Sequence, residues 1–455
     1  MKASKPHLST TQIIALGFLS AILAGGLLLS LPIASAKGTA TPFIDALFTA
    51  TTSVCVTGLV VVQTSSHWSL FGQMVILFLI QLGGLGVVSV ATMVMMLIGR
   101  RITLKNRLLL EDALNLNTLS GLIKFLKKVL KGTFFIEGIG CILYCLVFIP
   151  EYGWRKGFWI SLFNAVSAFC NAGIDIIGAV SLADYVTHPL INFVTMLLIV
   201  MGGIGFIVWE DIANSLRKLR NREVQDKKWW PRLQLHTRLV LITTAILIIG
   251  GALLILLFEY NNPNTIGSLT FFEKVQASFF QSVTTRTAGF FTFSQKNMVP
   301  TSAVICILLM FIGGSPIGTA GGIKTTTLAL LFLSAISTIK GERHVVVFHK
   351  RISHEIIKKA LAVTIVSTVI LLTLTILLYH LEGGALLDTL FETTSAIATV
   401  GLTRDYTPLL HTSGKAIIIL LMYLGRIGPI SLAIILGSRS QKAIISYPKE
   451  DIIVG

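Results

Sequence analysis

Four short stretches of the sequence each end in a glycine and expose a run of backbone carbonyls that could coordinate a cation. They read LFTATTSVCVTG (47–58), LFNAVSAFCNAG (162–173), FFQSVTTRTAG (279–289) and LFETTSAIATVG (390–401), and a phenylalanine lies ten residues before each glycine: Phe48, Phe163, Phe279 and Phe391. The glycines recur 112 to 116 residues apart, which indicates an internal repeat. Glycine accepts a positive φ and lacks a Cβ, so carbonyls beside it can turn toward a common axis.

Carbonyl oxygens without fixed carboxylates suit a weakly hydrated monovalent cation better than Ca²⁺ or Mg²⁺. The candidate filter residues are the last five of each stretch: Val54, Cys55, Val56, Thr57, Gly58; Phe169, Cys170, Asn171, Ala172, Gly173; Thr285, Arg286, Thr287, Ala288, Gly289; and Ile397, Ala398, Thr399, Val400, Gly401. Each is expected to be an extended run that follows about ten residues of helix. Ordinary surface turns are the alternative, but they leave the fourfold repeat unexplained.

The elements that must position these runs are membrane spans. The chain is 53% hydrophobic and 13% charged, with a mean hydropathy of +0.81, which is typical of an integral membrane protein. Apolar stretches long enough to cross a bilayer lie at 12–33, 71–98, 133–149, 189–209, 237–258, 301–338, 358–380 and 414–437. The sequence therefore predicts an all-α integral membrane protein of four tandem helix–pore-helix–helix repeats around a pseudo-fourfold central pore. It would contain eight spanning helices and four re-entrant pore helices.

Positive charge is concentrated in alternate segments. The net charge is +16, and 27 of the 37 Lys and Arg lie before the first span, in 99–132, 211–238 and 339–359, or after 437. The positive-inside rule makes these segments and both termini cytoplasmic in a bacterial inner membrane, with lipid head groups rather than nucleic acid as their partners. The expected units are 1–100, 133–210, 237–339 and 358–438, with cytoplasmic linkers at 101–132, 211–236 and 340–357 and a cytoplasmic tail at 439–455.

The third repeat has a second span that cannot be one regular helix. Residues 311–327 read FIGGSPIGTAGGIKTTT, with five glycines and a proline between 313 and 322. Gly costs roughly 1 kcal/mol and Pro roughly 3 kcal/mol inside a helix, so a loop is expected at mid-membrane. The candidate gate residues are Gly313, Gly314, Ser315, Pro316, Gly318, Thr319, Gly321, Gly322, Lys324 and Arg426. A substrate site in an unwound transporter helix is the competing interpretation.

Glycine motifs also mark the other second spans: QLGGLG (81–86), VMGGIG (200–205) and YLGRIG (423–428). In the first two repeats they indicate close helix packing. In the fourth, Arg426 interrupts an apolar span, where a charged residue is a functional candidate unless it reaches the interface. Beneath the filter, Arg426 would oppose cation entry and could hold the loop closed by donating to its carbonyls, with Lys324 as a second tether.

Together, the four glycines, the GG-x-G-like motifs and the broken helix resemble the Ktr/Trk/HKT superfamily, and most closely the Ktr membrane subunit. The resemblance implies a K⁺ filter with K⁺ bound at Gly58, Gly173, Gly289 and Gly401, an intramembrane loop as gate, and potassium uptake that depends on Na⁺. Plant relatives that prefer sodium carry Ser at the first glycine, so Gly58 favours potassium. A sodium-permeable or non-selective transporter is the alternative. The resemblance also implies a homodimer and a cytoplasmic nucleotide-binding regulatory ring that responds to ATP and ADP.

No enzymatic motif is present in the sequence: there is neither a phosphate-binding GxxxxGK[ST] nor a metal-ligand pattern. Arg286 is expected to form an ion pair with Glu273 or Glu392. Asn171 and Thr399 are expected to line the pore, although Asn171 could instead bond the backbone. Four aspartates, Asp45, Asp175, Asp388 and Asp405, are expected near the outer mouth, where they could concentrate cations, although Asp45 and Asp388 are better explained as helix caps. Glu137 is an intramembrane acid without an assigned partner. A coupled transporter of an organic solute would need two inverted halves, and the repeat here is direct.

Overall fold

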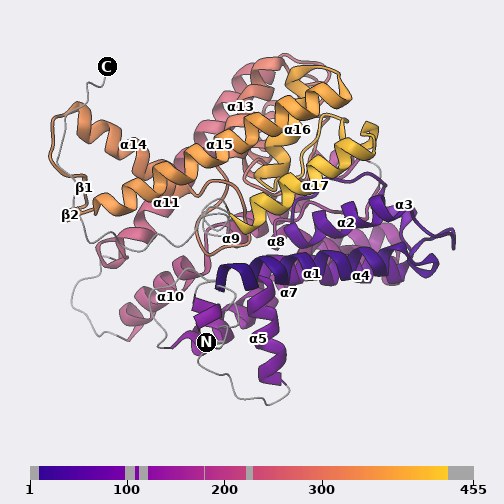
Figure 1. The fold of residues 1–455 in the computed structure, drawn as a ribbon, viewed down its shortest axis with the longest axis horizontal. Helices are drawn as coiled ribbons and strands as arrows, with labels where there is room; N and C mark the ends of the chain where they lie inside the picture. The colour runs from indigo at the N-terminus through magenta and orange to yellow at the C-terminus, as the bar shows by residue number, and fades with distance from the viewer. Residues whose placement is uncertain (1–9, 98–107, 112–120, 179, 222–228, 429–455) are drawn as a thin grey trace, which may run out of the picture.

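The computed structural model describes residues 10–97, 108–111, 121–178, 180–221 and 229–428. Along the chain, each of four units follows one long helix with a shorter, buried helix and then with one or more further helices (Figure 1). The first unit contains α1 (Thr10–Ser30), α2 (Phe43–Cys55), α3 (Thr64–His67), α4 (Leu70–Leu85) and α5 (Val87–Leu97); the second, α7 (Leu122–Tyr152), α8 (Trp154–Phe169), α9 (Pro189–Gly203) and α10 (Phe206–Arg220); the third, α11 (Leu235–Glu259), α12 (Phe271–Thr284), α13 (Pro300–Phe311) and α14 (Thr325–Ile339); and the fourth, α15 (His354–Glu382), α16 (Leu386–Ile397) and α17 (Thr412–Ile427).

Small elements complete the described chain. Strands β1 (Val346–Val347) and β2 (Lys350–Arg351) pair antiparallel between α14 and α15. Short 3₁₀ turns cover Pro32–Ala34, Ala183–Tyr185, Trp230–Arg232 and Thr407–Leu409. The fold is therefore helical throughout its described core, and the predicted all-α fold class is confirmed, while the eight spanning helices stay a prediction.

The first helix of each unit is long and apolar enough to cross a membrane. These helices are α1, α7, α11 and α15, and large apolar side chains on them are exposed, such as Leu27, Ile142, Leu257 and Ile376. Exposed Leu and Ile along such a helix are what contact with lipid tails requires. Helix α7 begins at Leu122, inside the segment predicted as a linker.

The second helices of the first two units are not the straight spans that the sequence predicted. Helices α4 and α5 meet at an angle of 100°, and α9 and α10 at 96°. The corners lie at Gly86 and Gly205, whose φ angles of 85° and 93° are incompatible with a continuing right-handed helix. In the fourth unit, α17 ends before Gly428, which has a φ of 89°, and the predicted continuation to 437 lies outside the described residues.

The buried short helices α2, α8, α12 and α16 are anchored by one phenylalanine each. Phe48, Phe163, Phe280 and Phe391 are all fully buried. The anchor of the third unit is therefore Phe280 rather than the predicted Phe279, and it lies nine residues before its glycine instead of ten. The third filter run is one residue shorter than the other three.

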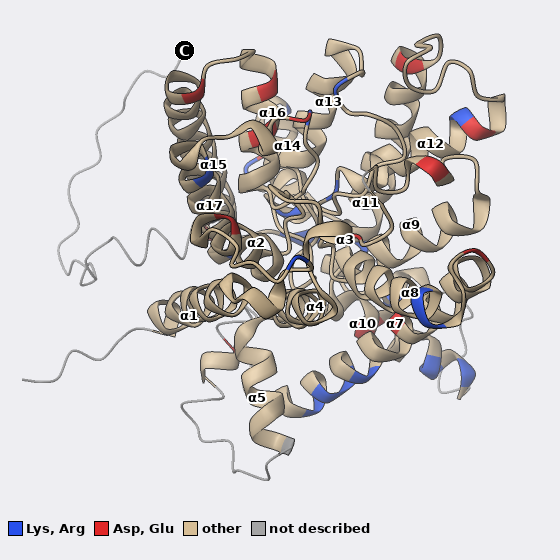
Figure 2. Ribbon diagram, turned by 90° about the vertical axis from the view of Figure 1, so that its right-hand side faces the viewer, with Lys and Arg blue, Asp and Glu red and all other residues tan. Residues whose placement is uncertain are grey.

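Positive side chains cluster at one end of the molecule. Figure 2 shows Lys and Arg gathered around α10 and the start of α7. The last turn of α10 carries Arg217, Lys218 and Arg220, and Lys128 of α7 pairs with Glu210 of α10 at 2.6 Å. Helix α10 is thus amphipathic, with Phe206 and Val208 buried and its basic end exposed.

Candidate functional site

The four filter runs meet in a closed ring at the centre of the molecule. A Cβ built on Gly58 would lie 2.6 Å from the carbonyl oxygen of Ala172 in the second repeat. In the same sense around the ring, Gly173 abuts the Ala288 carbonyl of the third repeat, and Gly289 abuts the Val400 carbonyl of the fourth.

Gly401 closes this ring against the Thr57 carbonyl of the first repeat. The φ angles of Gly58, Gly173, Gly289 and Gly401 are all positive, between 63° and 101°. Lack of space and backbone conformation both require glycine at these four positions.

Each run also contains a left-handed residue two positions before its glycine. These residues are Val56, Asn171, Thr287 and Thr399, with φ angles of 55°, 58°, 69° and 53°. Positive φ is a genuine outlier for β-branched residues, and such strain is found mostly at functional sites. A backbone that alternates in this way can aim neighbouring carbonyls at one axis.

The filter runs are shorter than predicted, because the pore helices extend into them. Val54, Cys55, Phe169 and Ile397 are still helical. In three repeats the helix ends with a hydrogen bond from a backbone N–H to the carbonyl five residues earlier. The bonds run from Thr57 to Thr52, from Ala172 to Ser167 and from Val400 to Ser395, each at 2.8 Å. This is the Schellman end, with the left-handed residue at its C′ position. The shorter third run lacks it, and Ala288 bonds Thr284 instead.

A hydroxyl residue four positions after each buried phenylalanine fixes the run that follows. Thr52 accepts from the Gly58 N–H at 2.9 Å, and Ser395 accepts from the Gly401 N–H at 3.0 Å. Ser167 donates to the Ile174 carbonyl at 2.6 Å, and Thr284 donates to the Phe290 carbonyl at 2.5 Å. Sequence reasoning missed these four residues, although the aligned stretches already place Thr52, Ser167 and Ser395 four positions after Phe48, Phe163 and Phe391.

Buried oxygens with no hydrogen-bond partner lie within the filter runs. The hydroxyls of Thr57, Thr287 and Thr399 find no partner within the described part of the chain. A buried polar group without a partner is unfavourable, so these oxygens fit a site that receives an ion or water. The described residues contain no group of three side chains that could hold a metal ion, so backbone and hydroxyl oxygens are the available ligands.

A vestibule opens directly above the ring. It has a volume of about 320 Å³ and is lined by all four glycines together with Asp175 and Thr403. Asp175 lies in the loop after α8, outside the spanning helices, and accepts a hydrogen bond from the Ile177 N–H at 3.3 Å. Desolvation in this hollow raises the pKa of the Asp175 carboxyl to about 6.

The broken segment of the third repeat packs beneath the ring. Residues 313–324 form no helix between α13 and α14. Thr319 donates its hydroxyl to the Phe169 carbonyl and to Asn171 Oδ1, both at 3.1 Å. The Asn171 amide in turn donates to the Arg286 carbonyl at 3.3 Å. Asn171 therefore joins the loop to two filter runs.

Two cationic side chains hold this loop. Arg426 donates to the Thr319 carbonyl at 2.7 Å and, through its other terminal nitrogen, to the Gly83 carbonyl of α4. Lys324 donates to the Ala320 carbonyl at 2.7 Å and to the Gly321 carbonyl at 3.4 Å. Arg426 therefore ties the loop to α4 and α17, and Lys324 bonds carbonyls of the loop itself.

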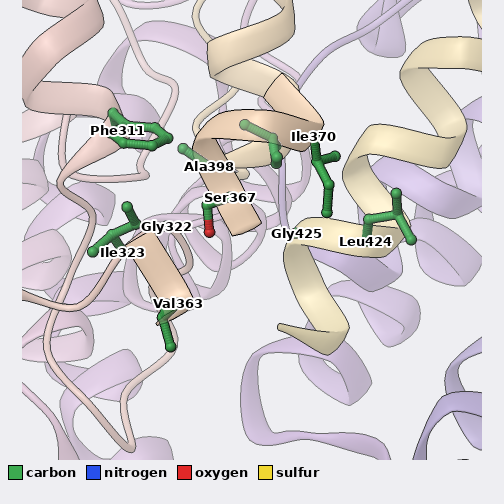
Figure 3. Close-up of a pocket in the computed structure, with 10 residues that line it drawn as sticks. Phe311, Gly322, Ile323, Val363, Ser367, Ile370, Ala398, Leu424 and Gly425 are labelled. Carbon is green, nitrogen blue, oxygen red and sulfur yellow. The ribbon is translucent and has the colours of Figure 1, made fainter. Parts of the chain in front are cut away.

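Behind the loop there is little free space. A hollow of about 30 Å³ lies between the loop and helices α15, α16 and α17 (Figure 3). It is lined by Gly322, Ile323, Ser367, Ala398 and Gly425 among others, and it has room for only one or two water molecules. Movement of the loop toward this side requires α15 or α17 to move.

Three motif glycines pack against the ends of their own pore helices. Gly83 abuts the Val54 carbonyl, Gly202 that of Phe169 and Gly425 that of Ile397. Close packing therefore holds for the first two repeats, as predicted from the sequence, and it extends to the fourth. Any side chain at these positions would push the pore helix out of place.

The predicted ion pair of Arg286 is wrong. Arg286 is buried, its Nε has no partner, and no salt bridge to it exists among the described residues. Glu273 caps the opposite end of α12 by accepting from the Thr270 N–H at 2.9 Å, which places it a whole helix away. Glu392 instead accepts hydrogen bonds from Thr403 and Thr407.

Glu137, which had no assigned partner, lies behind the second filter run. Its carboxylate accepts from Gln81 Nε2 at 3.4 Å and from the Cys170 thiol at 3.8 Å. Cys170 is the first residue after α8, so Glu137 supports the filter from the side away from the axis. Gln81 was not predicted, because its contact joins residues 56 positions apart in different units.

Comparisons with known proteins show which family and which fold this chain shares. The profile of the TrkH family, described as "Cation transport protein", matches residues 11–444. The chain is 39% identical to "Potassium/sodium uptake protein NtpJ" of Enterococcus hirae, over 100% of this chain and 99% of that protein. It is 40% identical to "Ktr system potassium uptake protein B" of Bacillus subtilis, over 98% and 96%. The solved structure of the potassium transporter TrkH from Vibrio parahaemolyticus superimposes with a TM-score of 0.73 at 16% identity, covering 96% of this chain and 87% of that chain.

Proposed function

The chain belongs to the TrkH family of cation transport proteins, multi-pass membrane proteins rather than enzymes, and from this we propose that it takes up potassium through the ring of Gly58, Gly173, Gly289 and Gly401. One observation carries the proposal. Each of the four glycines lies against the backbone carbonyl of the residue that precedes the glycine of the next repeat, so the four contacts form a closed ring. Four carbonyl runs around one axis can replace the hydration shell of K⁺. Two relatives support potassium as a transported ion, one named a potassium uptake protein and the other a potassium/sodium uptake protein.

The proposal is tested by uptake into cells. A bacterial strain without its own potassium uptake, made to express this chain, is expected to grow at low external potassium and to accumulate ⁸⁶Rb⁺. Failure of both, with the chain shown by immunoblot to be in the membrane, would overturn potassium uptake.

The alternative is a pore that passes sodium as well. The four filter runs differ in sequence, and the third is one residue shorter, so the ring is not strictly fourfold. A relative is named a potassium/sodium uptake protein. Measuring ²²Na⁺ uptake beside ⁸⁶Rb⁺ uptake separates the two functions, and repeating the ⁸⁶Rb⁺ assay without external sodium tests sodium dependence.

We place the loop 313–322 as the gate of this pore. Its hydrogen bonds to Phe169, Asn171 and Arg426 hold it against the ring, and Arg426 and Lys324 put positive charge in the path. The vestibule would face outward and the basic end of α10 inward, by the positive-inside rule. Partners remain those that the family resemblance implies: a second copy of this chain and a cytoplasmic nucleotide-binding ring.

We expect potassium uptake to fall as the pH of the vestibule side falls through about 6. The Asp175 carboxyl, with its raised pKa, is ionised at pH 7.5 and attracts cations to the ring, whereas at pH 5 it is neutral. Asp175→Asn should lower uptake at pH 7.5 about two- to fivefold and remove the pH dependence. The measurement is initial ⁸⁶Rb⁺ uptake from pH 5 to 8. An unchanged pH profile in Asp175→Asn would contradict this role.

A further inference from the structure

The corner between α9 and α10 is hydrogen-bonded to the gate loop. The Ser315 N–H donates to the Gly203 carbonyl at 2.9 Å, and the Thr319 N–H donates to the Gly202 carbonyl at 3.1 Å. In the other direction, the Phe206 N–H donates to the Ile317 carbonyl at 2.8 Å. Backbone groups of two broken helices thus satisfy each other, as irregular backbone inside a membrane requires.

Phe206 is the first residue of α10, which makes its hydrogen bond unusual. The N–H groups of the first helical turn have no partner within their own helix. The Phe206 N–H is therefore free to bond the loop, and any rotation of α10 about its first turn changes that bond directly. The preceding Gly205 abuts the Pro316 carbonyl, so the corner and the loop are in close contact.

Trp209, one turn into α10, fixes the angle of this corner. Its indole N–H donates to the Met201 carbonyl in the last turn of α9, at 3.0 Å. Its ring lies 5.6 Å from the ring of Phe169 at the end of the second pore helix and 5.2 Å from that of Phe206. Trp209 therefore touches the two parts of the molecule that the loop itself joins, the filter end and α10.

From these contacts we infer that α10 is a lever that holds the gate loop in place, with Phe206 and Trp209 as its positioning residues. The far end of the lever is exposed and carries Arg217, Lys218 and Arg220. A displacement applied to that basic end would withdraw the Phe206 N–H from Ile317 and release the loop. The inference rests on the proposed gating function of the loop.

Phe206→Pro compared with Phe206→Ala tests the lever. Proline is tolerated at the first helical position but has no N–H, so it removes the bond to Ile317 while α10 can still form. Alanine loses the same aromatic ring but keeps the N–H. In liposomes containing the purified full chain without partner proteins, Phe206→Pro should give about tenfold more ⁸⁶Rb⁺ flux than Phe206→Ala. The selectivity between Rb⁺ and Na⁺ should be the same in both.

A second pair of variants distinguishes the expected effect from misfolding. Trp209→Phe keeps an aromatic ring but loses the bond to Met201, and it should also raise flux, whereas Trp229→Phe changes an exposed tryptophan and serves as the matched control. Equal flux in Phe206→Pro and Phe206→Ala, both monodisperse, overturns the lever. So does equal flux in the two tryptophan variants.

Removal of residues 314–322 in the same liposomes separates the lever from the gate. If that deletion raises flux and the lever variants do not, the gate stands and the lever fails. If the deletion is also without effect, the proposed function of the loop fails with it.

Discussion

Replacing Gly58 by Ser is expected to lower the ratio of potassium to sodium flux by roughly 5- to 30-fold. The φ of 101° at Gly58 is unfavourable for any residue with a side chain, and a Cβ there would lie 2.6 Å from the Ala172 carbonyl. A 5- to 30-fold change corresponds to roughly 1–2 kcal/mol of lost discrimination, about the worth of one well-placed oxygen contact to a charged group. The new side chain must displace the neighbouring carbonyl, so the ring loses the spacing that fits K⁺. The measurement is paired ⁸⁶Rb⁺ and ²²Na⁺ flux into liposomes.

Gly38→Ser is the matched control for this change. Gly38 also has a positive φ, of 68°, but a Cβ there meets nothing within 4 Å, and it lies between α1 and α2, away from the ring. The control therefore also places a side chain on a residue with positive φ, but without touching a carbonyl. If Gly38→Ser altered the flux ratio as much as Gly58→Ser, the effect would come from strain alone and the ring would have no special role.

Deleting residues 314–322 is expected to raise cation flux at least about tenfold, because the loop proposed as the gate is removed. The structure shows how the chain can close over the gap. Ile312 and Ile323 form a parallel β-bridge, and the Ile323 N–H donates to the Phe311 carbonyl at 3.1 Å. The ends that the deletion joins are already neighbours, so α13 and α14 need not move far.

Combining this deletion with Gly58→Ser shows which path the ions take. If the ions pass through the ring, the double variant should conduct well but discriminate poorly between potassium and sodium. The deletion alone should conduct well and favour potassium. A leak around the protein would be unselective in both. An unselective deletion variant would therefore exclude the ring as the path of the extra flux.

The convergence of the four runs could be predicted, because the glycine and the phenylalanine of each run are close in sequence and recur at a nearly constant period. The register of the third run could not, because Phe279 and Phe280 are both apolar and only burial distinguishes them. The corners at Gly86 and Gly205 were missed for a related reason. A glycine in an apolar stretch is compatible both with close helix packing and with a positive φ. In these motifs Gly83 and Gly202 pack closely, whereas Gly86 and Gly205 have a positive φ.

Local sequence patterns could not predict the contacts between units. The bond from Thr319 to the Phe169 carbonyl joins residues 150 positions apart, and that from Arg426 to Thr319 joins residues 107 apart. Composition could place Arg426 in a span, and mid-span charge could mark it as functional, but its acceptors depend on how α17 packs beside the loop. The prediction of an ion pair for Arg286 failed because it considered only opposite charge. Glu273 lies in the first turn of α12 and Arg286 follows its end, so the length of the helix separates them.

The most direct measurement is competitive flux of potassium and sodium into liposomes that contain the purified chain without residues 314–322. The deletion removes the loop that we propose as the gate, so the result depends on the proposed filter alone. A ring of Gly58, Gly173, Gly289 and Gly401 that binds K⁺ predicts potassium flux well above sodium flux, with the preference lost when Gly58 is Ser. Equal flux of both ions in the deletion variant, or no flux at all from a correctly folded chain, would contradict a potassium-selective filter at these four glycines.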